Sequence, residues 1–306
     1  MPLKERLVFG TSKTRRNRNK NGRFCQEKNL KNCGILIDCY HMRHQIFDIP
    51  IDDLSDGELD QILHEWVVGN AQKIITTPNP EFLLLSRHDA SFKSILQKSD
   101  LSLPDGVGLR FAVVALTDET LKHRQTGVDL VDRLMRIGAE TGKRLVVVDG
   151  LDRSAEKVKA TFEQKYPGIQ LSTFQPGSIS FPLSESIMNR LNELHPEILL
   201  VALGQGKQER FIEDILPNIP SIRIAVGVGG AFDMLSGRKP RAPQILRRLG
   251  LEWLWRVLIE PRRIGRIFRA VFIFPLLVIS CTLTSHRFWK AVRRVVPEIY
   301  RQLTGI

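Results

Sequence analysis

The sequence has few cysteines and histidines, and neither residue type occurs in a metal-binding spacing. Its 306 residues contain four cysteines, at positions 25, 33, 39 and 281, and seven histidines. No C-x-x-C or H-x-x-x-H pair is present, so the spacing predicts no zinc site. We interpret the cysteines as reduced thiols of a cytosolic protein.

Several common ligand-binding motifs are also missing. No G-x-x-x-x-G-K-[ST] segment occurs, which excludes a P-loop kinase or ATPase. The segments GVGLRF (106–111) and GVGGAF (227–232) lack the third glycine of G-x-G-x-x-G, which weakens a nicotinamide or flavin interpretation. The chain has only three tyrosines, and no expected strand combines aromatic and basic residues as nucleic-acid-binding sheets do.

Long apolar segments are absent as well. The first 33 residues contain no apolar stretch of the kind found in a secretory signal peptide. The longest apolar run, AVFIFPLLVISCTL, covers residues 270–283 and has a proline near its centre. Such a run is too short to cross a bilayer.

The chain has many charged residues, 45 basic and 33 acidic, but they are unevenly distributed. The formal net charge is +12, with +8 on residues 1–33 and +12 on residues 238–306, which leaves −8 on residues 34–237. We expect the basic ends to meet an anionic partner, for which phospholipid head groups, nucleic acid and a diphosphate ligand all qualify. The acidic body argues against nucleic acid. Residues 1–33 are predicted to be a disordered basic arm.

From residue 34 onward, short apolar runs alternate with amphipathic ones. Buried strands are predicted at 34–39, 73–77, 144–150, 197–204 and 221–230. Helices are predicted near 57–69, 80–98, 106–116, 128–141, 153–165, 184–194 and 207–216. This alternation predicts an α/β fold with a Rossmann-like, doubly wound, mainly parallel sheet over residues 34–255. In such sheets the ligand binds beyond the carboxyl ends of the strands.

Residues 256–306 are expected to form a basic, amphipathic helical appendage that associates with a membrane. Between 261 and 274 one apolar stripe recurs at helical spacing, namely Ile264, Ile267, Phe268 and Val271. Arginines share another face, namely Arg262, Arg266 and Arg269. Pro275 is expected to break the pattern, which favours an interfacial helix or a shallow re-entrant segment. The alternative is a core helix packed on the sheet.

Polar or glycine-rich loops follow several of the expected strands. TPNPE contains Thr77 and Asn79, PDGVG contains Asp105, and the segments 204–209 and 227–237 are GQGKQE and GVGGAFDMLSG. Glycines leave backbone N–H groups available to an anion, and helix N-termini add positive potential. Together the loops predict a phosphorylated or nucleotide ligand, although Pro-Asp-Gly is also a common turn triplet.

Six segments together resemble one protein family over residues 34–269. They are TPNPEF, LPDGVGL, RQTGVDLV, LVALGQGKQERFI, VGVGGAFDMLSG and RAPQILRRLGLEWLWRVLIEPRR, and they look like the WecG/TagA/CpsF glycosyltransferases, family 26. The resemblance implies transfer of a sugar, such as N-acetylmannosamine, its uronic acid or glucose, from a UDP-sugar to a polyprenyl-diphosphate-linked saccharide. It also implies inversion at the sugar, no metal or other cofactor, and a peripheral position at the cytoplasmic face of the inner membrane, in cell-surface polysaccharide biosynthesis.

The same resemblance assigns residue roles. Asp105 matches the general base of the family. The residues expected to bind substrate are Thr77, Asn79, Gly106, Arg124, Gly127, Asp129, Gly204, Lys207, Gln208, Glu209, Gly229, Gly230, Arg256, Arg262, Arg263 and Arg266. Gly206 stands where the family motif G-x-P-K-Q-E has proline.

Some of these residues also have simpler explanations. Residues 124–129 form a capped helix start in the alternative interpretation, and Glu209 a first-turn helix acid. Asp233 is expected to be a cap or a sugar contact.

The chemistry of sugar transfer agrees with this assignment. No two aspartates lie two residues apart, so the D-x-D metal signature is missing, whereas arginines can bind a diphosphate through paired, charge-assisted hydrogen bonds. Three rival classes stay open at this point: a Rossmann oxidoreductase, a basic nucleic-acid-binding protein and a structural membrane-associated protein. The oligomeric state, including a homo-oligomer, is also open.

Overall fold

The computed structural model describes residues 17–18, 24–25, 42–117, 119–123, 125–150 and 154–304. The chain divides into two compact units, residues 1–41 and 42–306. In the first unit, β1 (Asn17–Arg18) pairs in antiparallel fashion with β2 (Phe24–Cys25). Apart from these two pairs of residues, the basic arm predicted over 1–33 and the strand predicted over 34–39 lie outside the described residues.

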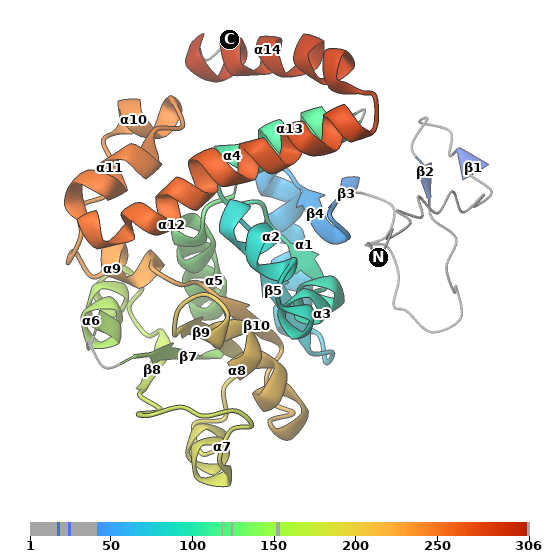
Figure 1. The fold of residues 1–306 in the computed structure, drawn as a ribbon. Coiled ribbons are helices and arrows are strands. Elements are labelled where there is room, and N and C mark those ends of the chain that lie inside the picture. Colours follow the sequence, from blue (N-terminus) through green and yellow to red (C-terminus); the bar gives the residue numbers. More distant parts are fainter. Residues whose placement is uncertain are drawn as a thin grey trace. The chain divides into compact units, whose positions relative to one another are not determined.

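The second unit contains a six-stranded sheet in which every pairing is parallel. The strand order is β6-β5-β10-β9-β7-β8, and Figure 1 shows the helices that surround this sheet. The bounds are β5 (Lys73–Thr76), β6 (Leu101–Ser102), β7 (Arg144–Asp149), β8 (Gln170–Phe174), β9 (Ile198–Ala202) and β10 (Ile224–Gly227). These strands are largely buried apolar runs, as a sheet covered on both faces requires. The Rossmann-like α/β prediction is confirmed.

Helices connect the strands, and polar side chains fix where several of them begin. The helices before the C-terminal segment are α1 (Asp56–Val68), α2 (Pro80–Ser86), α3 (Ala90–Lys98), α4 (Val107–Leu116), α5 (Gly127–Thr141), α6 (Ser154–Lys165), α7 (Glu185–Asn192), α8 (Lys207–Ile215) and α9 (Ala231–Leu235). The single helix predicted over 80–98 is wrong, because the chain leaves α2 at Arg87 and Asp89 then caps a new helix. The Asp89 carboxylate accepts a hydrogen bond from the Phe92 amide at 2.9 Å.

The predicted pattern omits β8 and also a hairpin near the start of the second unit. β3 (Met42–Ile46) and β4 (Ile49–Asp53) form an antiparallel hairpin. Its two turn residues, Phe47 and Asp48, have φ angles of 52° and 64°. Two-residue hairpin turns of this kind usually contain glycine or asparagine, so Phe-Asp gives no turn signal.

The C-terminal segment is helical throughout most of its length. It comprises α10 (Gln244–Arg248), α11 (Glu252–Ile259), η3 (Pro261–Arg263), α12 (Ile264–Phe268), η4 (Arg269–Ile273), α13 (Phe274–Thr284) and α14 (Phe288–Thr304). The break predicted at Pro275 is wrong. A π-helical turn, η4, precedes α13 and places Pro275 in the first turn of that helix, where the missing N–H is tolerated.

The run Pro261–Thr284 therefore forms one helix of 24 residues, long and apolar enough to cross a membrane by length and composition alone. The apolar run of residues 270–283 is shorter than this helix, because the helix already begins at Pro261.

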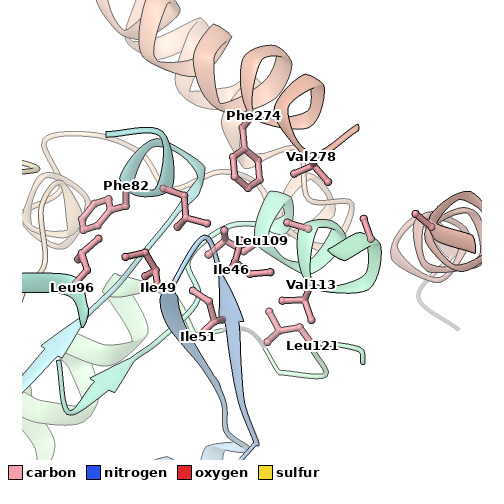
Figure 2. Close-up of a cluster of buried hydrophobic side chains, with 14 of the residues drawn as sticks. Ile46, Ile49, Ile51, Phe82, Leu96, Leu109, Val113, Leu121, Phe274 and Val278 are labelled. Atoms are coloured by element: carbon pink, nitrogen blue, oxygen red, sulfur yellow. The ribbon is translucent and has the colours of Figure 1, made fainter. Parts of the chain in front are cut away.

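One face of this helix belongs to the hydrophobic core. Figure 2 shows Phe274 and Val278 packed with Ile46 of the hairpin and with Leu109 and Val113 of α4. Phe274 is 1% exposed, and burial of such a side chain contributes about 1.5–3 kcal/mol. The alternative prediction of a core helix is therefore correct for this face. That prediction named the sheet as the packing partner, whereas the partners in this cluster are α4 and the hairpin.

The last helix, α14, also docks on α4. The Glu298 carboxylate is buried and forms an ion pair with Arg110 of α4. Arg287 and Arg294 donate to the carbonyl oxygens of Leu116 and Thr117, both at 3.1 Å, where the end of α4 leaves acceptors without helical partners. Residues 42–306 form one unit, and the domain boundary expected at residue 255 stays a prediction.

Candidate active site

A cavity of about 530 Å³ lies beyond the carboxyl ends of four adjacent strands. Its walls come from the loops after β5, β6, β9 and β10, from the first turns of α2, α4 and α5, and from segment 250–275. The volume falls in the range of small-molecule sites. Because parallel strands all end at the same edge, the strand order determines which loops meet there.

Asp105 lies in the wall formed by the loop after β6. The Leu103 amide donates to the carbonyl oxygen of Thr76 at 2.8 Å, and the Asp105 amide donates to that of Pro78 at 2.8 Å. These bonds tie the Asp105 loop to the loop after β5. Asp105 is half-buried and lines the cavity together with Gly106, which precedes α4.

Thr77 and Asn79 line the cavity and also hold its frame together. The Thr77 hydroxyl donates to the carbonyl oxygen of Gly227 at 3.2 Å, which joins the ends of β5 and β10. The Asn79 side-chain oxygen accepts from the Glu81 and Phe82 amides at 2.9 and 3.1 Å. Asn79 is therefore the N-cap of α2, a role that the prediction of a binding residue did not include.

The loop after β9 contributes Gly204 and Gln208 to the cavity. The Gln208 side-chain oxygen accepts from the Gly229 amide at 3.0 Å, so it connects this loop to the loop after β10. A Cβ on Gly227 would lie 2.5 Å from the Gln208 amide nitrogen, and glycine is therefore needed for this approach. Lys207 is exposed and lies outside the cavity lining.

Glu209 is buried and lies outside the cavity lining. It is 3% exposed, and its carboxylate accepts from the Gly206 amide and from the Gln208 side-chain amide, both at 2.7 Å. Burial raises the pKa of Glu209 to about 7, against the effect of these hydrogen bonds. This geometry corresponds to the first-turn helix acid.

Segment 125–129 is divided between the cavity and the outer surface. Thr126 and Gly127 line the cavity at the start of α5. Asp129 lies outside the lining, because its carboxylate accepts from the Thr126 hydroxyl at 2.6 Å and from Arg241 at 3.0 Å. Gln125 is buried and donates to Asp56 at 2.9 Å. Arg124 lies outside the described residues.

Three arginines of the C-terminal segment line the cavity: Arg256, Arg263 and Arg266. Arg262 and Arg269 are exposed and do not line it. Gly229 and Gly230, which end the β10 loop, form the facing wall. A Cβ on Gly230 would lie 3.4 Å from a nitrogen of Arg263 and 3.8 Å from one of Arg256, so the glycine lets both guanidinium groups approach the backbone.

Two of these arginines are bound by carboxylates that were not predicted as site residues. Arg263 donates to Glu260 at 2.7 Å, and Lys239 donates to the same oxygen at 3.0 Å. Although burial raises the pKa of Glu260, these two cations outweigh it and hold the pKa below its usual value. Asp233 lies outside the cavity lining, where it pairs with Lys239. Arg266 is bound by Glu81.

Four further residues line the cavity and were not among the predicted site residues, namely Glu81, Phe111, Gln205 and Trp253. Glu81 was visible only as a first-turn acid after Pro80, because its partner Arg266 lies 185 residues away. The apolar wall, which includes Ile267, Val271 and Pro275, comes from the C-terminal helix. No local pattern signals that this helix lines the cavity.

The arrangement combines a carboxylate at Asp105 with three guanidinium groups and the N-termini of α4 and α5. The guanidinium groups and helix N-termini favour an anionic ligand, and arginine matches the geometry of a phosphate. Within the described ranges, no group of three or more histidine, cysteine or acidic side chains is placed to hold a metal ion.

Comparison with known proteins agrees with this geometry. The model of the WecG/TagA/CpsF glycosyl transferase family matches residues 44–288. The chain belongs to this family. It is therefore a glycosyltransferase. This result favours that class over the alternatives of an oxidoreductase and a nucleic-acid-binding protein. α14 begins at the end of the matched range.

The chain is also similar to several individually named enzymes. A Bacillus subtilis (strain 168) protein is 27% identical over 223 residues, which cover 72% of this chain and 86% of the relative. A Staphylococcus aureus (strain MRSA252) protein is 28% identical over 193 residues, or 63% and 74% of the two chains. Both relatives are named N-acetylglucosaminyldiphosphoundecaprenol N-acetyl-beta-D-mannosaminyltransferase.

Proposed function

We propose that this glycosyltransferase moves one sugar from a UDP-sugar to a polyprenyl-diphosphate-linked saccharide, with inversion at the sugar. The observation that carries the proposal is that Asp105 and three arginines line the same cavity. The names of the relatives support the acceptor, because they act on N-acetylglucosaminyldiphosphoundecaprenol. The same names favour N-acetylmannosamine as the donated sugar, with its uronic acid and glucose as alternatives.

In the proposed reaction, Asp105 acts as the general base. A hydroxyl oxygen of the acceptor attacks the anomeric carbon of the donor, and the Asp105 carboxylate takes the hydroxyl proton. The new bond joins the acceptor oxygen to that carbon. The bond to the phosphate oxygen breaks on the opposite face, and its electron pair leaves with UDP. A single displacement of this kind inverts the anomeric centre.

The departing UDP gains negative charge, which guanidinium groups can stabilise. Arg256, Arg263 and Arg266 line the cavity, and we propose that they bind the diphosphate. Charge-assisted hydrogen bonds from guanidinium groups are worth most where water is excluded. We propose that they do the work that a divalent cation does in enzymes with a D-x-D motif.

We also propose that the protein is peripheral at the cytoplasmic face of the inner membrane. Large apolar side chains on the outer face of the long helix are exposed, namely Phe268, Phe272, Leu276, Ile279 and Leu283. Arg262 and Arg269 are exposed on the same helix. Because Phe274 and Val278 are buried in the core, lipid cannot surround this helix, which favours an interfacial position.

A donor screen tests the proposed reaction. Purified protein is incubated with a short-chain polyprenyl-diphosphate N-acetylglucosamine and each of several UDP-sugars, with and without EDTA. We expect transfer from one donor and no loss with EDTA. Failure of every UDP-sugar would contradict the donor class, and activity lost with EDTA but restored by manganese would contradict the role of the arginines.

Asp105→Asn tests the general base in the same assay. We expect the rate of transfer to fall about 10²–10⁴-fold, while UDP still binds. The matched control is Asp132→Asn, which removes an exposed carboxylate paired with Lys165 outside the cavity. Full turnover by Asp105→Asn would end the assignment of the base.

A further inference from the structure

Arg266 is held across the cavity by a carboxylate from a distant part of the chain. Its Nε donates to both oxygens of Glu81 at 3.1 and 3.0 Å, and its Nη2 donates to Oε2 at 2.8 Å. Nη2 also donates to the side-chain oxygen of Gln205 at 2.9 Å. All three residues line the cavity. The contact joins the C-terminal segment to the loops that follow β5 and β9.

The geometry of the guanidinium group leaves one of its edges for a ligand. Arginine has five N–H groups in a fixed plane. Glu81 and Gln205 engage the N–H groups on Nε and Nη2, and the contacts of the described residues do not use those on Nη1. The fork is therefore oriented before any ligand arrives, with Nη1 available for a phosphate oxygen.

Glu81 is itself held in a rigid position. It follows Pro80 in the first turn of α2, which Asn79 caps. The positive end of the helix favours a carboxylate at this position, and the Glu81 side chain is 16% exposed. An arginine that binds this carboxylate therefore loses much of its side-chain freedom before ligand binding.

The other two cavity arginines are held within their own segment. Arg263 binds Glu260, three residues earlier, and Arg256 lies 4.0 Å from Glu252, four residues earlier. Of the three, Arg266 is the one whose carboxylate partner, Glu81, lies in α2, which follows β5 of the sheet. Its side chain is 40% exposed, and such partly exposed ion pairs contribute little to folding stability. Ligand binding is a better explanation of the pair than stability.

We propose that Glu81 and Gln205 are positioning residues, which orient Arg266 so that its Nη1 edge binds the diphosphate of the donor. This inference rests on the proposed function. Arg266 keeps its bonds to Glu81 when the nucleotide binds. The cost of ordering the arginine side chain therefore does not reduce the free energy of nucleotide binding. Without Glu81, the arginine must be ordered by the nucleotide itself.

Glu81→Gln tests the proposal by steady-state kinetics and by calorimetric titration with UDP. The contact to the diphosphate already exists in the bound substrate and strengthens as the departing UDP gains charge, so its weakening acts on both binding and the chemical step. We expect KM for the UDP-sugar and Kd for UDP to rise about tenfold, and kcat to fall as well. Gln205→Ala removes the weaker anchor, and we expect a two- to threefold rise.

A double-mutant cycle identifies the route through Arg266. We expect Arg266→Gln alone to weaken UDP binding, and the Glu81→Gln/Arg266→Gln double variant to bind UDP no more weakly than Arg266→Gln. Additive losses would overturn the proposal, because Glu81 would then act independently of Arg266. Tighter UDP binding by Glu81→Gln would also overturn it, because Glu81 would then compete with the nucleotide.

Two controls keep these outcomes interpretable. Glu140→Gln removes a carboxylate paired with Arg136 on the surface of α5, and we expect no change in KM or Kd. Thermal unfolding without UDP should be the same for Glu81→Gln and the unsubstituted protein. If UDP does not bind the unsubstituted protein, the proposed function fails; if UDP binds it and Glu81→Gln equally, only the positioning role fails.

Discussion

Buried Glu209 should make the stability of this protein depend on pH in an unusual direction. Its ordinary pKa is 4.5, and burial raises the pKa to about 7 in the folded chain. Between these values the unfolded chain releases the proton while the folded chain keeps it. The stabilising contribution of Glu209 is therefore fully present below pH 4.5 and is lost as the pH rises through 7.

The size of the effect follows from the distance between the two pKa values. One pKa unit corresponds to about 1.4 kcal/mol, so the difference from 4.5 to about 7 corresponds to about 3 kcal/mol of unfolding free energy. Glu209→Gln carries no titrating group at this position. We expect the stability of the unsubstituted protein, relative to this variant, to decrease by about 3 kcal/mol between pH 4 and pH 8.

Urea unfolding at pH 4, 6 and 8, followed by circular dichroism, measures this difference. Other acids titrate in both proteins, so their contributions cancel in the comparison. Glu213→Gln, which removes a more exposed carboxylate from the same helix, controls for the loss of a carboxylate from α8. A difference that stays constant within about 1 kcal/mol, or that increases with pH, would refute the reasoning.

Two further predictions concern the long C-terminal helix. Phe274→Ala should lower the free energy of unfolding by about 3–5 kcal/mol in urea titrations, whereas Phe272→Ala, on the exposed face, should change it by less than about 1 kcal/mol; equal effects would contradict the packing of this helix. Leu276→Asn/Leu283→Asn should weaken co-sedimentation with anionic phospholipid vesicles at least about tenfold. Val68→Asn, at an exposed position on α1, should not weaken it, and unchanged binding by the double variant would count against the interfacial helix.

The strands and their loops were the most predictable part of the molecule. β5, β7, β9 and β10 are continuous apolar runs, and capping side chains mark the starts of α1, α2, α3 and α5. The predicted loops do converge on one cavity. Such signals are local, because burial on both faces of a sheet and the capping of a helix depend on residues close together in sequence.

At several residues the structure departs from what the local pattern indicates. Pro275 looked like a helix break, but the preceding π-helical turn accommodates it. Asp129 and Glu209 belong to motifs that also supply cavity residues, yet their carboxylates bind Arg241 and the Gly206 amide outside the cavity. Arg262 and Arg269 differ from Arg263 and Arg266 only in the side of the helix that they occupy.

The amino-acid sequence by itself determined the α/β class, the polar loops and the family, because these depend on short-range patterns and on the identity of residues. The tertiary structure alone placed β10 between β5 and β9, which brings Thr77, Gln208 and Gly229 together. It also paired Glu81 with Arg266. Strand order and helix docking are set by the packing of apolar faces across the whole molecule, and no local pattern records which face meets which.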